Sequence, residues 1–245
     1  MNCKNCGQTV NDKFCSKCGQ RSDVSRINFT NFIDEVSQSF FKINKGFFYT
    51  LKELTVRPGN TLKEYLDGKR KSHFKPIAYL LALSTVYFFI TKATDQNTLI
   101  GDLVAGWMDG ASELNSNVEV PKIASWFLAN YAYTALLLLP IFSLASYIAF
   151  LKFHKTYLEH VVLNAYITGH QAIFYSLFAV IKTVTVNPVF DMLPALVAVS
   201  YTFWVFWQFF SQGNRTMNIL RSLMTYTLYL ILSTMLLGIL MINEL

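Results

Sequence analysis

Long runs without charged residues restrict this chain to a membrane fold. Five such runs cover residues 76–91, 123–151, 161–181, 192–214 and 222–243. A helix needs about 20 apolar residues to cross the hydrocarbon core, and four of the runs reach that length. The first run is shorter, but Lys75 and Lys92 flank it and can extend their amines to the two interfaces. We therefore predict an all-α integral membrane protein with about five transmembrane helices near 76–92, 123–151, 161–181, 190–212 and 219–243.

Composition and charge agree with this class. The 245 residues are 53% hydrophobic and 15% charged, with a mean hydropathy of +0.32, which is too apolar for a soluble domain. The formal net charge of +6 does not indicate nucleic-acid binding, because the basic residues concentrate beside the apolar runs. Anionic lipid head groups and the orientation rule explain that position. Membrane lipids are therefore expected partners, and nucleic acid is not.

The distribution of Lys and Arg predicts the topology. Basic residues flanking a span are retained in the cytoplasm. If the N-terminus is cytoplasmic and the C-terminus outside, the outer connections carry three basic residues, Lys92, Lys122 and Lys182. The cytoplasmic side then carries ten: Arg57, Lys63, Lys69, Arg70, Lys71, Lys75, Lys152, Lys155, Arg215 and Arg221.

All four cysteines lie within the first 18 residues, as Cys3-x2-Cys6-Gly7 and Cys15-x2-Cys18-Gly19. Two intervening residues let both thiolates of a pair point at one ion, and the following glycine permits the tight turn around the sulfurs. A redox dithiol would need only one such motif, on a thioredoxin-like fold. We predict a structural Zn²⁺ held in a closed site by a zinc ribbon over residues 1–20. A closed site has no open position for catalysis.

Residues 28–75 are predicted to form amphipathic helices on the cytoplasmic side, after a polar linker over 20–28. Apolar residues recur at helical spacing from 29 to 54. This face could lie against lipid or pack on the bundle. Arg57-Pro58-Gly59 should end that helix, and Thr61 with Glu64 has the spacing of a capping box, which predicts a second helix ending at Gly68.

The third run is the most polar and supplies candidate functional residues. An ionisable group within a span is costly in lipid, so His170 should face other helices or a wet cavity. It could be functional, or it could be an ordinary interhelical hydrogen-bonding group. His154 with its neighbours could bind a metal or a phosphate head group, or be solvated charge in a connection. The candidate polar cluster is Glu159, His160, Asn164 and His170.

Four further features of the sequence bear on its structure or function. The basic cluster Lys69, Arg70, Lys71 and Lys75 could bind anionic lipid, although orientation alone would also require it. Asp191 could ligate an ion or begin a helix. Pro140 predicts a tilted or kinked second span. An acidic connection over 95–119 contains a short amphipathic pattern over 99–108.

These motifs resemble an uncharacterised family of Bacteroidota inner-membrane proteins that carry a domain of unknown function. The resemblance rests on the paired cysteine motifs continuing to Gln20, on Arg57-Pro58-Gly59 with Tyr65 and Gly68-Lys69-Arg70, and on Glu159-His160 before an apolar run. It covers most of the chain, with its motifs mainly in the first 80 residues. It implies a multi-span protein of the bacterial inner membrane with a cytoplasmic zinc ribbon, and it assigns no activity.

We find no nucleophile elbow, phosphate loop, HExxH motif or paired intramembrane carboxylates, so an enzyme is not indicated. The leading hypothesis is a non-enzymatic scaffold or adaptor that displays the zinc ribbon to a cytoplasmic protein partner. The alternative is a small-solute or ion transporter, suggested by the polar third run and by Pro140 and Pro194 within spans. A lipid-modifying enzyme ranks third.

Overall fold

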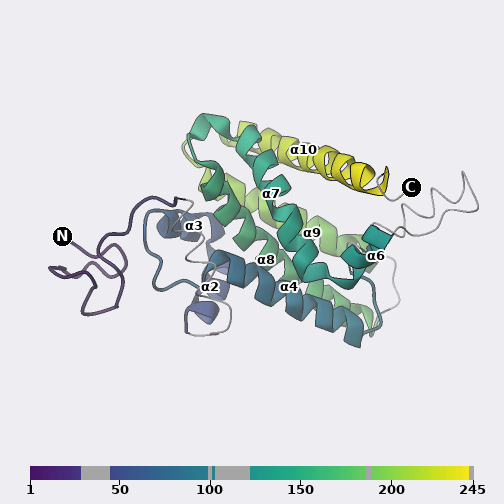
Figure 1. Ribbon diagram of the computed structural model, residues 1–245, viewed down its shortest axis with the longest axis horizontal. Coiled ribbons are helices and arrows are strands. Elements are labelled where there is room, and N and C mark those ends of the chain that lie inside the picture. Colours follow the sequence, from purple (N-terminus) through teal and green to yellow (C-terminus); the bar gives the residue numbers. More distant parts are fainter. Residues whose placement is uncertain (29–44, 99–100, 103–121, 186–188, 243–245) are drawn as a thin grey trace, which may run out of the picture.

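The computed structural model describes residues 1–28, 45–98, 101–102, 122–185 and 189–242 (Figure 1). Their regular structure is helical, apart from isolated β-bridges near the N-terminus. The described part of the chain contains α2 (Lys45–Val56), α3 (Pro58–Leu66), α4 (Pro76–Ala93), α6 (Lys122–Ala129), α7 (Tyr131–Ala149), the 3₁₀ turn η1 (Leu151–Phe153), α8 (Tyr157–Lys182), α9 (Val189–Phe209) and α10 (Arg215–Ile242).

The protein belongs to the predicted class of all-α integral membrane proteins. Within the described ranges, four helices are long and apolar enough to cross a membrane: α4, α7, α9 and the Arg215–Leu236 part of α10. Helix α8 is longer than most of these, at 26 residues, but more polar. It lies in the middle of the bundle and contacts α4, α7 and α9 (Figure 1). The predicted number of five spans is therefore approximate.

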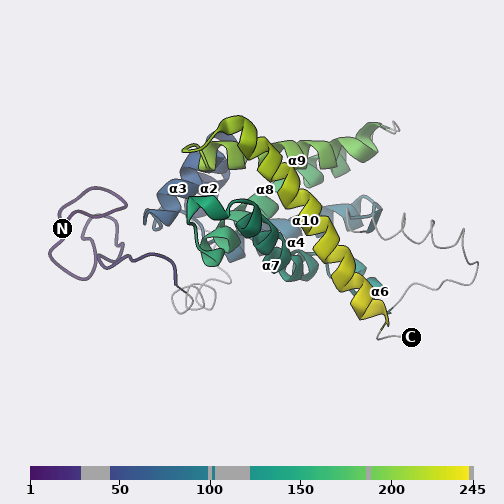
Figure 2. The same ribbon diagram turned by 90° about the horizontal axis from the view of Figure 1, so that it is seen from above.

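Close packing joins α4 to the central helix. A β-carbon added to Gly169 on α8 would lie 3.0 Å from the Cα atom of Leu80 and 2.9 Å from the ring of Tyr79. The absence of a side chain at Gly169 therefore lets the two helices approach closely. Helix α10 lies on the outside and crosses the bundle obliquely (Figure 2). It exposes apolar side chains that include Leu223, Leu230 and Met235, as expected of a surface facing lipid.

The predicted second span is two helices rather than one. Asn130 separates α6 from α7, because its backbone angles of −128° and 50° leave the helical region. Its side-chain amide donates to the carbonyl of Trp126. Pro140 lies inside α7 without ending it. The prediction of one 29-residue helix over 123–151 is therefore wrong, and Asn130, rather than Pro140, interrupts it.

Arg57 separates α2 from α3, and Pro58 and Gly59 are the first residues of α3. The prediction that these residues end the first helix is confirmed, since α2 ends at Val56. The predicted capping box is wrong, because α3 already begins at Pro58, whose fixed φ suits the first helical turn. The hydroxyl of Thr61 donates to the Arg57 carbonyl inside that turn instead.

Several predictions concern residues that the structure does not describe. The first half of the predicted amphipathic pattern, over 29–44, lies outside the described residues. Most of the acidic connection over 95–119 also lies outside the described residues, together with nearly all of its amphipathic pattern over 99–108. The described second half of the amphipathic pattern, α2, contacts α9, where the hydroxyl of Tyr201 donates to the Leu54 carbonyl at 3.0 Å. Phe48 and Val56 on α2 remain exposed.

Candidate metal centre and its docking surface

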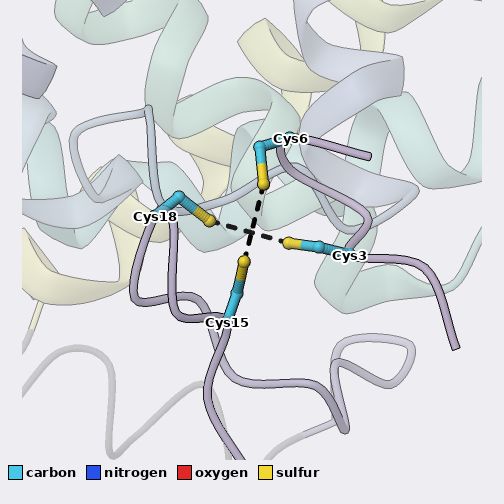
Figure 3. A group of neighbouring side chains, drawn as sticks. All are labelled: Cys3, Cys6, Cys15 and Cys18. Carbon is cyan, nitrogen blue, oxygen red and sulfur yellow. Dashed lines mark hydrogen bonds between the residues drawn. The ribbon is translucent and has the colours of Figure 1, made fainter. Parts of the chain in front are cut away.

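The four cysteine side chains converge from two successive turns of the chain (Figure 3). Their sulfur atoms all lie within 4.8 Å of one another. The two crossed pairs are closer: the Sγ atoms of Cys3 and Cys18 are 3.6 Å apart, and those of Cys6 and Cys15 are 3.5 Å apart. Four sulfurs at about 2.3 Å from a tetrahedral Zn²⁺ would be about 3.8 Å apart. The donor set and spacing therefore fit a four-coordinate zinc ion.

The two turns repeat the same backbone hydrogen bonds. The N–H of Cys3 donates to the Gln8 carbonyl, and the N–H of Cys15 donates to the Gln20 carbonyl. Gly7 and Gly19 close the turns with φ angles of +77° and +69°, which favour glycine. The first cysteine of each motif, Cys3 or Cys15, also accepts a hydrogen bond from a backbone N–H group. The N–H of Cys18 is the main cause that lowers the pKa of the Cys15 thiol to about 7, which favours the thiolate that binds metal. Desolvation and the neighbouring thiols raise the pKa of Cys6 to about 11 in the cluster without metal.

Residues 1–28, called the headpiece below, contact the bundle through a short loop. This docking loop comprises residues 68–72 and connects α3 to the segment before α4. The Gln20 side chain donates to the Gly68 carbonyl at 2.9 Å, and its Oε1 accepts from the backbone N–H groups of Arg70 and Lys71, each at 3.1 Å. Asn5 Oδ1 accepts from the N–H and the hydroxyl of Ser72.

These contacts correct the prediction that residues 20–28 are an uncoupled linker. Ile27 is buried in the main hydrophobic core of the bundle. The guanidinium of Arg26 pairs with the carboxylate of Glu159 at 2.7 Å and also donates to the His154 carbonyl. The polar composition of this stretch suggested a linker, but its polar side chains serve as docking contacts.

The same Glu159 carboxylate caps the central helix. Thr156 and Glu159 form a capping box: the N–H of Glu159 donates to the Thr156 hydroxyl, and the N–H of Thr156 donates to the carboxylate. The side chain of Glu159 is only 5% exposed. Glu159 therefore joins the start of α8 to Arg26 of the headpiece.

The other members of the predicted polar cluster do not converge on one site. His160 Nδ1 and Asn164 Nδ2 both contact the Ser146 hydroxyl on α7, at 2.9 and 2.7 Å. His170 Nδ1 lies 2.8 Å from the hydroxyl of Tyr79, and its Nε2 lies 3.3 Å from that of Thr55. These are interhelical contacts of the kind that hold membrane helices together.

The predicted basic cluster is divided among different partners. Lys69 pairs with Glu64 at 2.8 Å, and Arg70 donates to the Ser25 carbonyl of the headpiece at 2.9 Å. Lys71 is exposed and lies beside Gly19. Lys75 immediately precedes α4. Two members of the cluster thus contact protein groups. The prediction that this cluster faces lipid stays a prediction.

Asn5, Gln20 and Arg26 were missed as candidate site residues. A signal for one of them was available, since both cysteine motifs continue with Gly-Gln. Gln8 follows the first motif and is exposed, whereas Gln20 follows the second and is 4% exposed. Which of the two glutamines contacts the bundle depends on the tertiary arrangement.

Comparison with known proteins agrees with an uncharacterised domain. A family model described as "Protein of unknown function (DUF3667)" matches residues 44–88. The described part of that segment comprises α2, α3, the docking loop and most of α4. No curated protein and no solved structure matches the chain.

Proposed function

We propose that this protein is a non-enzymatic scaffold or adaptor whose zinc-bound headpiece recruits a protein partner. In this proposal the chain lies in a bacterial inner membrane, with the headpiece in the cytoplasm and the C-terminus outside. The direction of the helices supports this orientation. Lys63, Lys155 and Arg221 lie at the same end of the bundle as the headpiece, and basic residues that flank spans are retained in the cytoplasm.

The observation that carries the proposal is an exposed aromatic side chain on a headpiece that is otherwise held in place. Phe14 directly precedes Cys15 and is 57% exposed. Burying a phenylalanine side chain contributes about 1.5–3 kcal/mol, which a partner that covered Phe14 would gain in part. Lys13 and Lys17 flank this position and are also exposed. An acidic protein surface with an apolar pocket would complement it.

Affinity purification from cells tests this proposal with variants that separate zinc binding from recognition. The Cys3→Ser, Cys6→Ser double variant removes two metal ligands, and Phe14→Ala removes the aromatic side chain while leaving the ligands. We expect both to lose the partners that the wild type retains. The matched control, Gln8→Ala, alters an exposed headpiece residue and should retain them. Identical partner sets for all four proteins would contradict a role mediated by the headpiece.

The alternative, a small-solute or ion transporter, has one observation in its favour. A polar cavity of about 30 Å³ lies at the end of the bundle away from the headpiece, lined by Gln96, Asp102, Lys182 and Asp191 among others. That volume has room for only a few water molecules. The hydrogen bonds of His170 to neighbouring helices make that residue a poor transport ligand. Ion flux into proteoliposomes that is lost with Asp191→Asn would favour a transporter over the scaffold.

A further inference from the structure

We infer that the docking loop is a phosphate-binding site, and that two amide oxygens of the headpiece occupy it in the docked state. Phosphate binding and headpiece docking would then be mutually exclusive. This inference concerns the docking loop and does not depend on the recruitment role proposed for Phe14.

The backbone of the loop supplies consecutive donors. The N–H groups of Arg70, Lys71 and Ser72 donate to the headpiece, and the hydroxyl of Ser72 adds a fourth donor. The N–H of Arg70 is shared, since it also donates to the Gly68 carbonyl at 3.0 Å. Consecutive backbone N–H groups that face one side of a turn form an anion-binding concavity. Gly68, with a φ angle of +115°, begins this turn in a conformation that favours glycine.

The present occupants bind as a phosphate would, through oxygen atoms that each accept two hydrogen bonds. Gln20 Oε1 takes the N–H groups of Arg70 and Lys71, while Asn5 Oδ1 takes both donors of Ser72, at 3.2 and 3.0 Å. Both occupants are neutral amides. An anionic oxygen forms hydrogen bonds roughly twice as strong with the same donors. Gln20 Nε2 also donates to the Gly68 carbonyl at 2.9 Å, a contact that only a protonated phosphate oxygen could replace. The four donors together with this carbonyl therefore suit a singly protonated phosphate.

Electrostatics also favour an anion at this loop. Lys69, Arg70 and Lys71 are consecutive, and Glu64 is the carboxylate paired with Lys69. The headpiece does not supply the missing negative charge. Its side chains include five basic and two acidic residues, so it remains positive even with a charge of about −2 on a zinc–tetrathiolate centre. Docking therefore places one positive surface on another, whereas a phosphate group that replaced the headpiece would neutralise the loop.

The metal centre would control access to the site. Asn5 lies between Cys3 and Cys6, and Gln20 follows Cys18-Gly19. Zinc coordination thus fixes the two oxygens relative to each other. The loop also lies just before α4, where phosphate groups of anionic lipids are concentrated. The phosphate could come from such a head group or from solution.

Three zinc-loaded full-length proteins in phosphatidylcholine nanodiscs test the inference. They are the wild type, an Asn5→Ala, Gln20→Ala variant that removes both occupants, and an Asn11→Ala, Gln8→Ala control that removes two exposed headpiece amides. Metal analysis first verifies about one zinc per chain in each. Calorimetric titration with inorganic phosphate should give at least tenfold tighter binding to the Asn5, Gln20 variant than to the other two proteins.

Limited proteolysis of the wild type identifies the source of the phosphate. Trypsin can cleave after Arg26 only when that side chain leaves Glu159, so cleavage reports headpiece release. Faster cleavage in nanodiscs that contain phosphatidic acid would support the site with a lipid head group as its ligand. Faster cleavage with inorganic phosphate alone would support it with a dissolved phosphate as its ligand. Equal phosphate affinity of the three proteins, with no acceleration by either probe, would overturn the inference.

Discussion

Gly59 shows how one residue positions the segment that matches the family model. A β-carbon at this position would overlap the side chain of Gln208 and lie 2.5 Å from the backbone nitrogen of Phe209 on α9. The N–H of Gly59 also donates to Gln208 Oε1 at 3.0 Å. Glycine is required at this position because α3 and α9 approach each other closely, and not because of its backbone conformation. Gly59 thus lets the first turn of α3 pack against the end of α9.

Gly59→Ala should therefore destabilise the protein by about 1–3 kcal/mol, the usual range for overpacking a close contact. Thermal unfolding of purified protein, followed by circular dichroism, provides the measurement. Asn60→Ala is the matched control, because Asn60 is the exposed neighbour in the same turn. Equal unfolding temperatures for the two variants would show that α3 can move away from α9 without loss.

His73 predicts a pH dependence at the same surface. It is 7% exposed and lies edge-on to the rings of Tyr49 and Tyr65, and neither ring nitrogen has a hydrogen-bond partner in the described part of the chain. Desolvation lowers its pKa below the usual 6.5, although the nearby backbone carbonyl of Lys69 and, more weakly, Glu64 and Glu53 oppose the shift. The folded protein thus binds the proton less readily than the unfolded chain does.

The contribution of His73 to stability should be full above about pH 6.5 and decrease as the pH falls through the interval down to its folded-state pKa. We expect His73→Phe to remove this loss. At pH 5.5 its unfolding temperature should be about 2–4 °C above that of the wild type, equivalent to roughly 1 kcal/mol. Both proteins should carry Cys3→Ser and Cys6→Ser, so that acid release of zinc does not contribute. If the two proteins lost the same amount of stability between pH 7.5 and pH 5.5, His73 would not be the source of the pH dependence.

At the scale of elements, the start of α8 combines a helix cap with a contact to the headpiece. Glu159 is nearly buried, whereas its partner Arg26 has a side chain that is 57% exposed. Removing the arginine leaves a buried carboxylate without its counterion. Removing the carboxylate leaves a guanidinium that water can solvate, and a glutamine at the third position of the helix can still complete the capping box.

Arg26→Ala should therefore destabilise the protein more than Glu159→Gln, by about 1 kcal/mol. Chemical denaturation of both variants and of the double variant measures the difference and their coupling. Thr156→Ala serves as the comparison for the cap alone and should cost about 1 kcal/mol. The reverse order of the two single variants would mean that the carboxylate is well solvated without Arg26.

The helices were largely predictable, but their docking partners were not. Lipid requires each crossing segment to satisfy its own backbone, so the apolar runs predicted α4, α8, α9 and α10 within a few residues. The four cysteines were predictable because metal spacing is local. The contact of Gln20 with Gly68 joins residues 48 positions apart, and a polar side chain in sequence does not reveal whether its partner is water or a distant carbonyl.

At the scale of the whole molecule, the metal centre and the bundle should respond differently to chelation. A zinc ion on the four cysteines would hold the headpiece, whereas the spans keep their backbone hydrogen bonds within lipid. Chelation should release about one zinc per chain and make residues 1 to about 20 protease-sensitive, with little change in helical circular dichroism. Arg26 and Ile27 contact the bundle directly, so the expected sensitivity should end before these two residues.

Cys3→Ser should reproduce the protease sensitivity without chelator. Collapse of the helical signal on chelation would contradict the prediction. So would purified protein that contains no zinc and resembles the Cys3→Ser variant in its proteolysis.

The ion pair between Arg26 and Glu159 also imposes an order on biosynthesis. The two residues are 133 positions apart, and chains emerge from the ribosome N-terminus first. The cysteines would be free to bind a metal ion as soon as they leave the exit tunnel, but the counterion of Arg26 does not yet exist. A nascent or prematurely terminated chain would carry a folded headpiece that cannot form this ion pair. The complete docked state is therefore confined to chains translated at least as far as the start of α8.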